Sequence, residues 1–152
     1  MNGNELKGKP HFFTGAVVNP GTTTEANFEL QILKMEKKIS NGAKFFQTQA
    51  VYEPEKFYKF MKRVEGFKVP VLVGIIPLKS VGMARFMNKS VAGVFVPEPL
   101  IKKMAEAKDK TQTGLQIAAD LIKQLKDICQ GVHIMPIGWE LKVPQILDLA
   151  GL

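Results

Sequence analysis

Two glutamines are the side chains of this sequence best placed to bind a ligand. Gln47 and Gln49 lie two residues apart in the segment 45–52, which otherwise has the composition of a buried strand. Because side chains alternate along a strand, both amides lie on one face. A buried amide without a partner costs about 1–3 kcal/mol, so each must bond to the other, to backbone, to water or to a ligand. Gln49, nearer the carboxyl end where parallel sheets hold ligands, is the candidate for ligand contact, whereas we expect Gln47 to face the packed interior.

Basic side chains form a second candidate set. Lys34, Lys37 and Lys38 are spaced i, i+3 and i+4, so a helix carries them on one face. This face is either solvated, with Glu36 nearby, or binds a phosphate, which lysine meets as a point charge. Lys79 and Ser80 lie between a predicted strand and a predicted helix, a place that favours anions.

Composition restricts the class of protein. The chain has 152 residues, a net charge of +7 and 45% hydrophobic residues, which fits one domain with a real core. Its lysines are scattered and lack interleaved aromatic residues, so we expect no nucleic-acid partner. The single Cys129 excludes an intramolecular disulfide and a multi-cysteine metal site, and we predict a cytoplasmic protein without bound metal. The longest apolar run, residues 69–78, is too short to span a membrane.

The hydrophobic pattern alternates between strand and helix. We predict a polar lead-in over residues 1–10 and a domain over 11–152, with the first helix starting at a capping box of Thr22 and Glu25. Residues 91–97 are either a further strand or an irregular connection, and we expect them outside the main sheet. The predicted strands are 12–18, 45–51, 70–76 and 132–137.

Such alternation predicts an α/β fold with a parallel sheet. A doubly wound sheet would need a glycine-rich phosphate loop after its first strand, and the sequence has none there. About four strand–helix units instead make half of a (β/α)8 TIM barrel. A half barrel leaves two sheet edges unpaired, so we expect it to associate with the missing half or with a second copy of itself.

Four stretches resemble one enzyme family. They are GAVVNPG (15–21), LQILKMEKKISNGAKFFQTQAVYEPEKF (30–57), GIIPLKSVGMARFM (74–87) and GVHIMPIGWELKVPQILDLAGL (131–152). The family is methylenetetrahydrofolate reductase, a flavin-dependent enzyme of one-carbon metabolism that belongs to methionine biosynthesis. The chain is similar to the C-terminal half of the family's barrel, and its lead-in is similar to an internal segment of longer members, as if Met1 began a fragment.

The resemblance implies roles for several residues. It implies a barrel that holds FAD, with methylenetetrahydrofolate stacked on the flavin at the carboxyl ends of the strands. The family's substrate glutamine falls on Gln49, and its flavin-contacting lysine falls on Lys38. Lys34 and Lys37 match polar and basic positions beside that lysine, and Asn19 matches a position that touches the flavin.

Departures from the family are equally informative. The catalytic glutamate of the family belongs to the half of the barrel that this sequence does not match, so no catalytic residue is assigned here. Where better-known members hold folate with an arginine, this chain has Gly138, Trp139 and Glu140. Trp139 is expected either to stack on a ring or to pack the barrel mouth, and Lys79 is a candidate for the glutamate tail of the folate.

Two main functions follow from the resemblance. The first is a flavin-dependent oxidoreductase that reduces 5,10-methylenetetrahydrofolate to 5-methyltetrahydrofolate, with NAD(P)H or a reduced iron–sulfur protein as electron donor. The second is a non-catalytic module that binds flavin or folate and needs a partner, because this chain alone lacks the catalytic glutamate. A structural fragment that binds nothing is a third reading.

Overall fold

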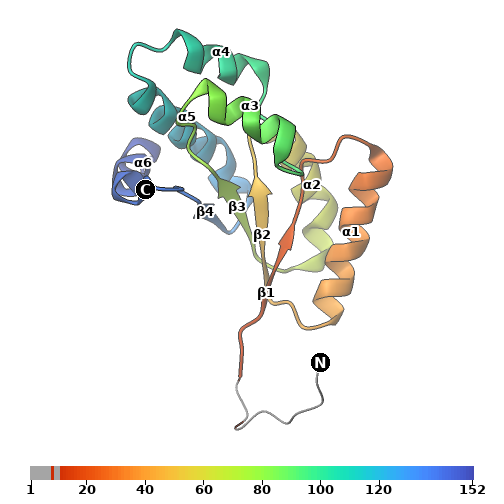
Figure 1. Ribbon diagram of the computed structural model, residues 1–152. Helices are drawn as coiled ribbons and strands as arrows, with labels where there is room; N and C mark the ends of the chain where they lie inside the picture. The colour runs from red at the N-terminus through yellow and green to blue at the C-terminus, as the bar shows by residue number, and fades with distance from the viewer. Residues whose placement is uncertain (1–7, 9–10) are drawn as a thin grey trace.

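Four parallel strands alternate with helices along the chain (Figure 1). We describe the fold from a computed structural model, which describes Gly8 and residues 11–152; the predicted lead-in lies almost wholly outside these residues. The sheet order is β1-β2-β3-β4. The strands are β1 (Gly15–Val18), β2 (Phe45–Ala50), β3 (Val71–Ile75) and β4 (Gly131–Ile134). The helices are α1 (Glu25–Ser40), α2 (Pro54–Val64), α3 (Val81–Ser90), α4 (Glu98–Glu106), α5 (Lys110–Leu125) and α6 (Val143–Ala150). Short 3-10 turns cover Glu65–Phe67, Lys126–Ile128 and Glu140–Lys142.

The four predicted strands are confirmed, and residues 91–97 lie outside the sheet as expected. The first strand is shorter than predicted, however. The paired part of β1 starts at Gly15, opposite Phe45, and just before it the Thr14 carbonyl accepts the Lys44 amide and the Phe13 ring stacks on Phe45 at the edge of the sheet. Phe12 and Phe13, which we expected in a buried strand, are 79% and 76% exposed.

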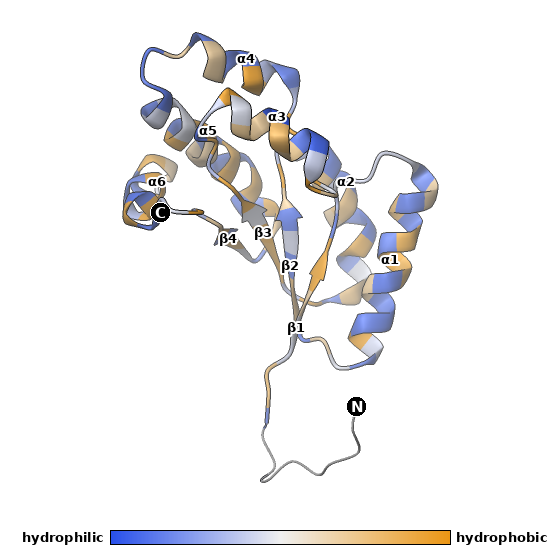
Figure 2. Cartoon of the chain, viewed as in Figure 1, coloured by the Kyte–Doolittle hydropathy of each residue, from blue (hydrophilic) through white to orange (hydrophobic). Residues whose placement is uncertain are grey.

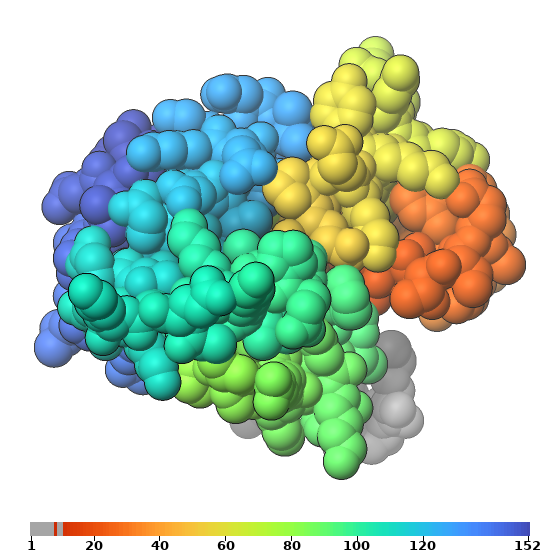
Figure 3. Space-filling model, turned by 90° about the horizontal axis from the view of Figure 1, so that it is seen from above, coloured from red at the N-terminus to blue at the C-terminus, as the bar shows by residue number. Residues whose placement is uncertain are grey.

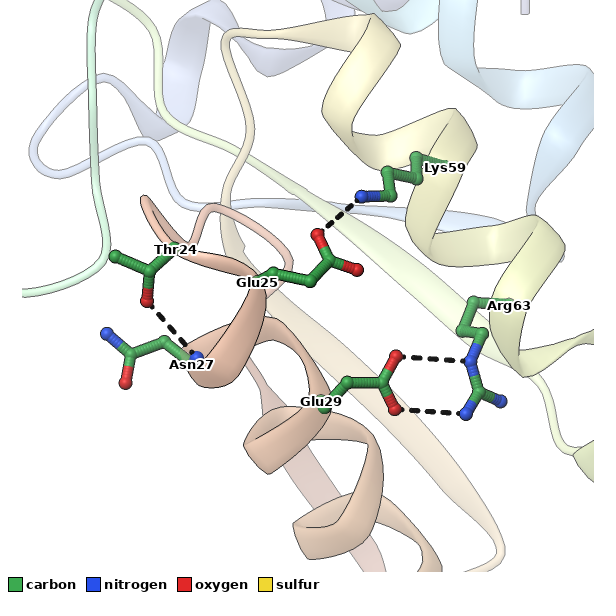
Figure 4. Close-up of polar contacts among 6 residues, drawn as sticks. All are labelled: Thr24, Glu25, Asn27, Glu29, Lys59 and Arg63. Carbon is green, nitrogen blue, oxygen red and sulfur yellow. Dashed lines mark hydrogen bonds and ion pairs between the residues drawn. The ribbon is translucent and has the colours of Figure 1, made fainter.

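The first helix begins later than predicted. The capping box expected at Thr22 and Glu25 is wrong, because the cap is Thr24, whose hydroxyl accepts a 3.2 Å hydrogen bond from the Asn27 amide (Figure 4). Two further contacts in Figure 4 join α1 to α2: Lys59 donates to Glu25 at 2.8 Å, and Arg63 binds Glu29 at 3.0 Å. All four side chains are largely exposed, so each pair contributes only about 0–1 kcal/mol.

One face of the sheet is buried by helices. Along β2, the buried residues Phe46, Thr48 and Ala50 alternate with half-buried Phe45, Gln47 and Gln49. The buried set packs with the apolar faces of α1, α2 and α5, where Met35, Phe57, Phe60 and Leu115 are almost fully buried. Figure 2 shows the hydrophilic colour on β2, which marks its two glutamines as unusual in the middle of a sheet.

We call the other side of the sheet the open face; its central row is Val17, Gln47 and Leu72, which lie in register on β1, β2 and β3. Val17 is 60% exposed, and the two neighbours in the row are half-buried. Beside three glycines of the strands, the space that a side chain would take is occupied by a large side chain from a neighbouring strand or from the residues that follow it. Phe45 lies over Gly15, Leu72 over Gly131 and Met135 over Gly74, at positions where an added Cβ would approach to 3.0 Å or less.

These features agree with part of a TIM-barrel-like fold. In a closed barrel the open face is the interior, and the edges of β1 and β4 pair with further strands. In the described residues each of these two strands pairs on one side only. The helices of this part of the chain include none that is long and apolar enough to cross a membrane.

The exposed edges lead to a prediction about association. We expect the isolated chain to form dimers or larger species at micromolar concentration, because unpaired edges and a half-exposed open face favour pairing with another sheet. Light scattering over a dilution series measures this directly. A clean monomer at every concentration would contradict the half-barrel interpretation.

Candidate functional site

The carboxyl ends of β1 and β2 lie beneath a segment that is distant in sequence. Residues 91–97, which we call the strap, connect α3 to α4 and contact Asn19 after β1 and Gln49 in β2. Figure 1 draws α3 and α4 beyond the carboxyl ends of the strands. Figure 3 looks down on this end, where the green and teal atoms of α3, the strap and α4 occupy much of the visible face. Parallel α/β folds place their ligand sites at this end of the sheet.

A β-bulge precedes the carboxyl end of β2. Gln47 pairs with Leu72, but the next paired residues are Ala50 and Gly74, so β2 contains one extra residue. The Thr48 hydroxyl compensates: it accepts the Gly74 amide at 2.9 Å and donates to the Gln49 carbonyl at 2.8 Å. Bulges re-aim side chains beside functional sites, and this one is placed to direct Gln49. The alternation of side chains did not predict this bulge, although a threonine among the buried residues of the strand was a signal of it.

Gln49 is held by two backbone groups. Its Nε2 donates to the Ala92 carbonyl at 3.2 Å, and its Oε1 accepts the Ala50 amide at 3.1 Å. The sequence left open whether the Gln49 amide bonds to Gln47, to backbone, to water or to a ligand, and the structure shows bonds to backbone. An amide group offers two N–H donors and two acceptor lone pairs, so one donor and one lone pair are left for a ligand.

Gln47 differs from the sequence expectation. Its side chain is half-buried on the open face and makes no hydrogen bond to any described residue. The expectation of a packed interior is wrong for this chain, because the elements that would cover the open face of a full barrel lie outside the matched half.

Asn19 lies beside Gln49 under the strap. Its Oδ1 accepts the Gly21 amide at 3.0 Å, which forms a turn directly after β1. Its carboxamide lies against Gly93, where an added Cβ would be 2.1 Å from Asn19 Nδ2. The structure thus brings together Asn19 and Gln49, two of the predicted site residues, through the same strap.

The three lysines of α1 lie elsewhere. Lys34, Lys37 and Lys38 are exposed, and none forms an ion pair with a described residue. Lys38 reaches back to β1, where its Nζ donates to the Val17 carbonyl at 2.5 Å. Because β1 is an edge strand, this contact supplies a hydrogen bond to a backbone carbonyl that a further strand would otherwise bond. No hydrogen bond joins these lysines to Asn19 or Gln49.

Lys79 and Trp139 meet at the carboxyl ends of β3 and β4. The Lys79 Nζ donates to the Ile137 carbonyl and lies 5.6 Å from the centre of the Trp139 ring. Lys142 lies 5.9 Å from the same ring. Ser80 caps α3 by accepting the Met83 amide at 3.0 Å, as expected for the junction of a strand and a helix.

The turn after β4 holds a carboxylate beside these cations. Glu140 accepts the Gly138 amide at 2.9 Å, and hydrogen bonds from the backbone amides of Glu140 itself and Gly138 lower its pKa. Ile137 and Gly138 both have positive φ, 48° and 83°, and the turn places the Ile137 carbonyl beside Lys79 and the Gly138 amide beside Glu140. The carboxyl ends of β3 and β4 therefore carry two lysines, one tryptophan and one ionised carboxylate.

Tyr52 was not predicted as a site residue. Its hydroxyl donates to the Ile76 carbonyl at 2.7 Å, which ties the end of β2 to the end of β3. Burial raises the pKa of this phenol, so it remains a neutral hydrogen-bond donor. Its role is to hold the two strand ends at a fixed separation.

A sizeable cleft lies away from these residues. This cleft of about 590 Å³ opens at the amino end of β3, between Tyr58, Lys62, Lys68, Asp127 and Gln130. None of the predicted site residues lines it. The candidate site is therefore the rim of the sheet below the strap, and it is open toward the open face.

Comparison with known proteins gives a consistent result. The sequence model of the family described as methylenetetrahydrofolate reductase matches residues 10–151. Methylenetetrahydrofolate reductase 2 of Schizosaccharomyces pombe is 31% identical over 130 residues, covering 76% of this chain and 20% of that protein. Methylenetetrahydrofolate reductase (NADH) 1 of Arabidopsis thaliana is 23% identical over 133 residues, covering 81% of this chain and 22% of that protein. This chain thus spans about a fifth of the length of these curated relatives.

A solved structure has a similar fold. It is an uncharacterized protein from Clostridium thermocellum that binds two copies of 5-methyl-5,6,7,8-tetrahydrofolic acid. The TM-score is 0.60 at 19% identity, over 90% of this chain and 51% of that one.

The contacts of the two glutamines predict different effects on stability. We expect Gln49→Glu to lower the free energy of unfolding by about 1–3 kcal/mol, because it removes the donor to Ala92 and places a carboxylate beside that carbonyl. Gln47→Glu, on the same face but without a hydrogen bond, should change it by less than about 0.5 kcal/mol. Urea unfolding of the two variants measures the difference, and equal losses would contradict the assigned contacts.

Proposed function

This chain belongs to the methylenetetrahydrofolate reductase family, and we propose that it forms the folate-binding part of a flavin-dependent oxidoreductase. The reaction is the reduction of 5,10-methylenetetrahydrofolate to 5-methyltetrahydrofolate. The observation that carries the proposal is Gln49, an amide with one free donor and one free acceptor at the carboxyl end of a strand. A pterin ring has a mixed edge of donors and acceptors, which such an amide matches.

The remaining rim residues fit the rest of a folate. Trp139 offers a flat apolar surface, and Lys79 and Lys142 lie close to its ring. A folate joins ring systems to glutamate carboxylates, so its rings could stack on the tryptophan while its carboxylates bind the two lysines. In this proposal they replace the arginine that the resemblance led us to expect. The protein of similar fold from Clostridium thermocellum, which binds 5-methyl-5,6,7,8-tetrahydrofolic acid, adds support.

The positive charge of the α1 lysines would also complement the negative phosphates of a flavin nucleotide. Lys34 and Lys37 carry ammonium groups without an ion pair to a described residue, and Lys38 uses one of its three N–H donors on Val17. These three lysines would hold the phosphates, and Asn19 would contact the flavin from the end of β1. FAD, when bound, supplies the hydride for the methylene carbon. The protein's own contribution is to orient the folate through Gln49 and to place positive charge near the phosphates.

A second candidate function is a binding module without chemistry. The resemblance places the family's catalytic glutamate on the first strand of the barrel, which precedes the matched half. In this reading the chain holds folate or flavin and acts only with the missing half or with a second copy of itself. NAD(P)H and a reduced iron–sulfur protein are the proposed electron donors, and a cytoplasmic location agrees with the single cysteine.

Folate binding tests the proposal. We expect the purified protein to bind 5-methyltetrahydrofolate in isothermal titration. Gln49→Glu should weaken this binding about 10- to 100-fold, from about 1.4–2.8 kcal/mol, because its acceptors meet the acceptors of the ligand. Gln47→Glu is the matched control on the same strand face and should bind like the parent. All three proteins are compared at a temperature where each is folded. A parent that binds no folate, or two variants that bind alike, would refute the assignment.

Flavin binding tests the lysine set separately. We expect flavin absorption in the purified protein or on titration with FAD. Lys38→Ala should weaken FAD binding by about 1.5–3 kcal/mol, or about 10- to 100-fold, through the loss of one charge-assisted hydrogen bond. Lys123→Ala removes another exposed lysine, from α5, and serves as the control. If both variants retain FAD like the parent, the basic face of α1 is merely solvated.

A further inference from the structure

The strap is fixed at its carboxyl half and presents its tip to the site. The Asn88 side chain accepts the Val96 amide at 2.6 Å and donates to the Val96 carbonyl at 2.9 Å. Val94 and Val96 are 5% and 0% exposed, so they anchor the strap in the core. Phe95 between them is more exposed, with the Lys56 ammonium 5.5 Å from its ring. The tip, Ala92 and Gly93, is thereby held over the ends of β1 and β2.

The tip touches both predicted contact residues. The Ala92 carbonyl accepts the Gln49 Nε2 at 3.2 Å. Gly93, at φ +79°, leaves the space that the Asn19 carboxamide fills, and its carbonyl lies 3.0 Å from where a Cβ on Gly21 would be. The two neighbouring residues of the tip thus contact one predicted site residue each.

These contacts set the direction of the Gln49 amide. If the group rotated by half a turn, Oε1 would face the Ala92 carbonyl and Nε2 would face the Ala50 amide, so both contacts would become repulsive. The order of the free N–H and the free lone pair is therefore fixed before any ligand arrives. With the free N–H and the free lone pair held in fixed places, the amide binds most strongly a ring whose edge carries an acceptor and a donor on adjacent atoms. It binds an edge that carries only acceptors more weakly.

The space under the strap indicates where that ring lies. The crevice between the strap, the ends of β1 and β2 and the start of α2 has a volume of about 10 Å³, bounded by Pro20, Tyr52, Phe57, Gly93 and Phe95 among others. This is room for about one water molecule and far too little for a ring. Gln49 does not line this crevice, and its half-buried side chain lies on the side of β2 opposite Phe46, Thr48 and Ala50, so a ligand of Gln49 would approach from the open face.

We propose that the strap is a positioning element of the ligand site: Ala92 orients Gln49, Gly93 accommodates Asn19, and together they select ligands with an adjacent donor and acceptor. This inference deepens the proposed function and, for the identity of the ligand, rests on it. Ala92 and Gly93 act through the two side chains and do not themselves react.

The unmodified protein provides the first test. In ¹⁵N NMR spectra, the side-chain amide protons of Gln49 should exchange with water more slowly than those of Gln47. The latter lies on the same face without a hydrogen bond and is an internal control. Equal exchange rates would overturn the proposal, because Ala92 would then not hold the amide. This measurement needs no ligand and no variant.

Folate binding by glycine variants provides the second test. Gly93→Ala and Gly42→Ala both place a Cβ at positive φ, +79° and +98°, but only the first meets a neighbour, Asn19; Gly42 has no atom within 4 Å of the added Cβ. We expect Gly93→Ala to weaken 5-methyltetrahydrofolate binding about tenfold, the loss of about one hydrogen bond, and to shift the Gln49 amide resonances. Gly42→Ala should do neither.

The possible outcomes separate the two proposals. If Gly93→Ala binds folate like Gly42→Ala, the strap does not position the site and the inference is wrong. If the parent binds no folate, the proposed function fails by itself, and slow exchange of the Gln49 amide together with its shift in Gly93→Ala still supports the positioning role. If Gly93→Ala fails to fold, the exchange rates of the Gln49 and Gln47 side-chain amides in the parent protein decide whether the strap holds Gln49.

Discussion

Each parallel strand of this sheet requires a crossover connection before the next, and the crossover helices that cover a face of the sheet all pack on the same side. That side is filled by the apolar faces of α1, α2 and α5 around Phe46, Phe57 and Phe60. The other side has half-buried side chains, and the outer edges of β1 and β4 carry unpaired backbone in the described residues. A parallel sheet normally has both faces covered. The same imbalance explains the exposed Val17, the contact of Lys38 with an edge carbonyl, and the expectation of a partner that completes the barrel.

The carboxyl ends of the strands are organised more closely than the rest of the open side. Thr48 replaces a missing ladder hydrogen bond at the bulge, and Tyr52 ties β2 to β3 through the Ile76 carbonyl. The strap then closes over the ends of β1 and β2. Every buried side-chain nitrogen or oxygen in the described residues has a hydrogen-bond partner, so these polar groups make rigid connections at low cost in stability. A rigid rim is what a site needs if it is to orient a ligand by a single amide.

Charge is distributed differently from these polar contacts. Lys79 and Lys142 lie at the rim beside Trp139, whereas the lysines of α1 lie along the outer surface and at the β1 edge. In the function proposed above, the first group meets the acidic tail of a folate and the second group meets the phosphates of a separate ligand, a flavin nucleotide. Cys129 takes no part: its thiol donates to backbone carbonyls, and burial raises its pKa, which keeps it in the unreactive thiol form.

The sequence by itself determined the order of the elements, the parallel sheet, the exclusion of residues 91–97 from it, and the family. These depend on hydrophobic periodicity and on turn residues, which act over a few positions. It also singled out Gln49 as a candidate for ligand contact, because a polar residue in a buried strand is visible locally. Only the tertiary structure decided the partners of that amide, since Ala92 lies 43 residues away along the chain. It likewise decided the bulge at Thr48, the late start of β1 and the half-exposed position of Gln47. Each of these depends on which strands or segments lie alongside, and no local pattern records where a neighbouring strand begins or which face of a sheet is left uncovered.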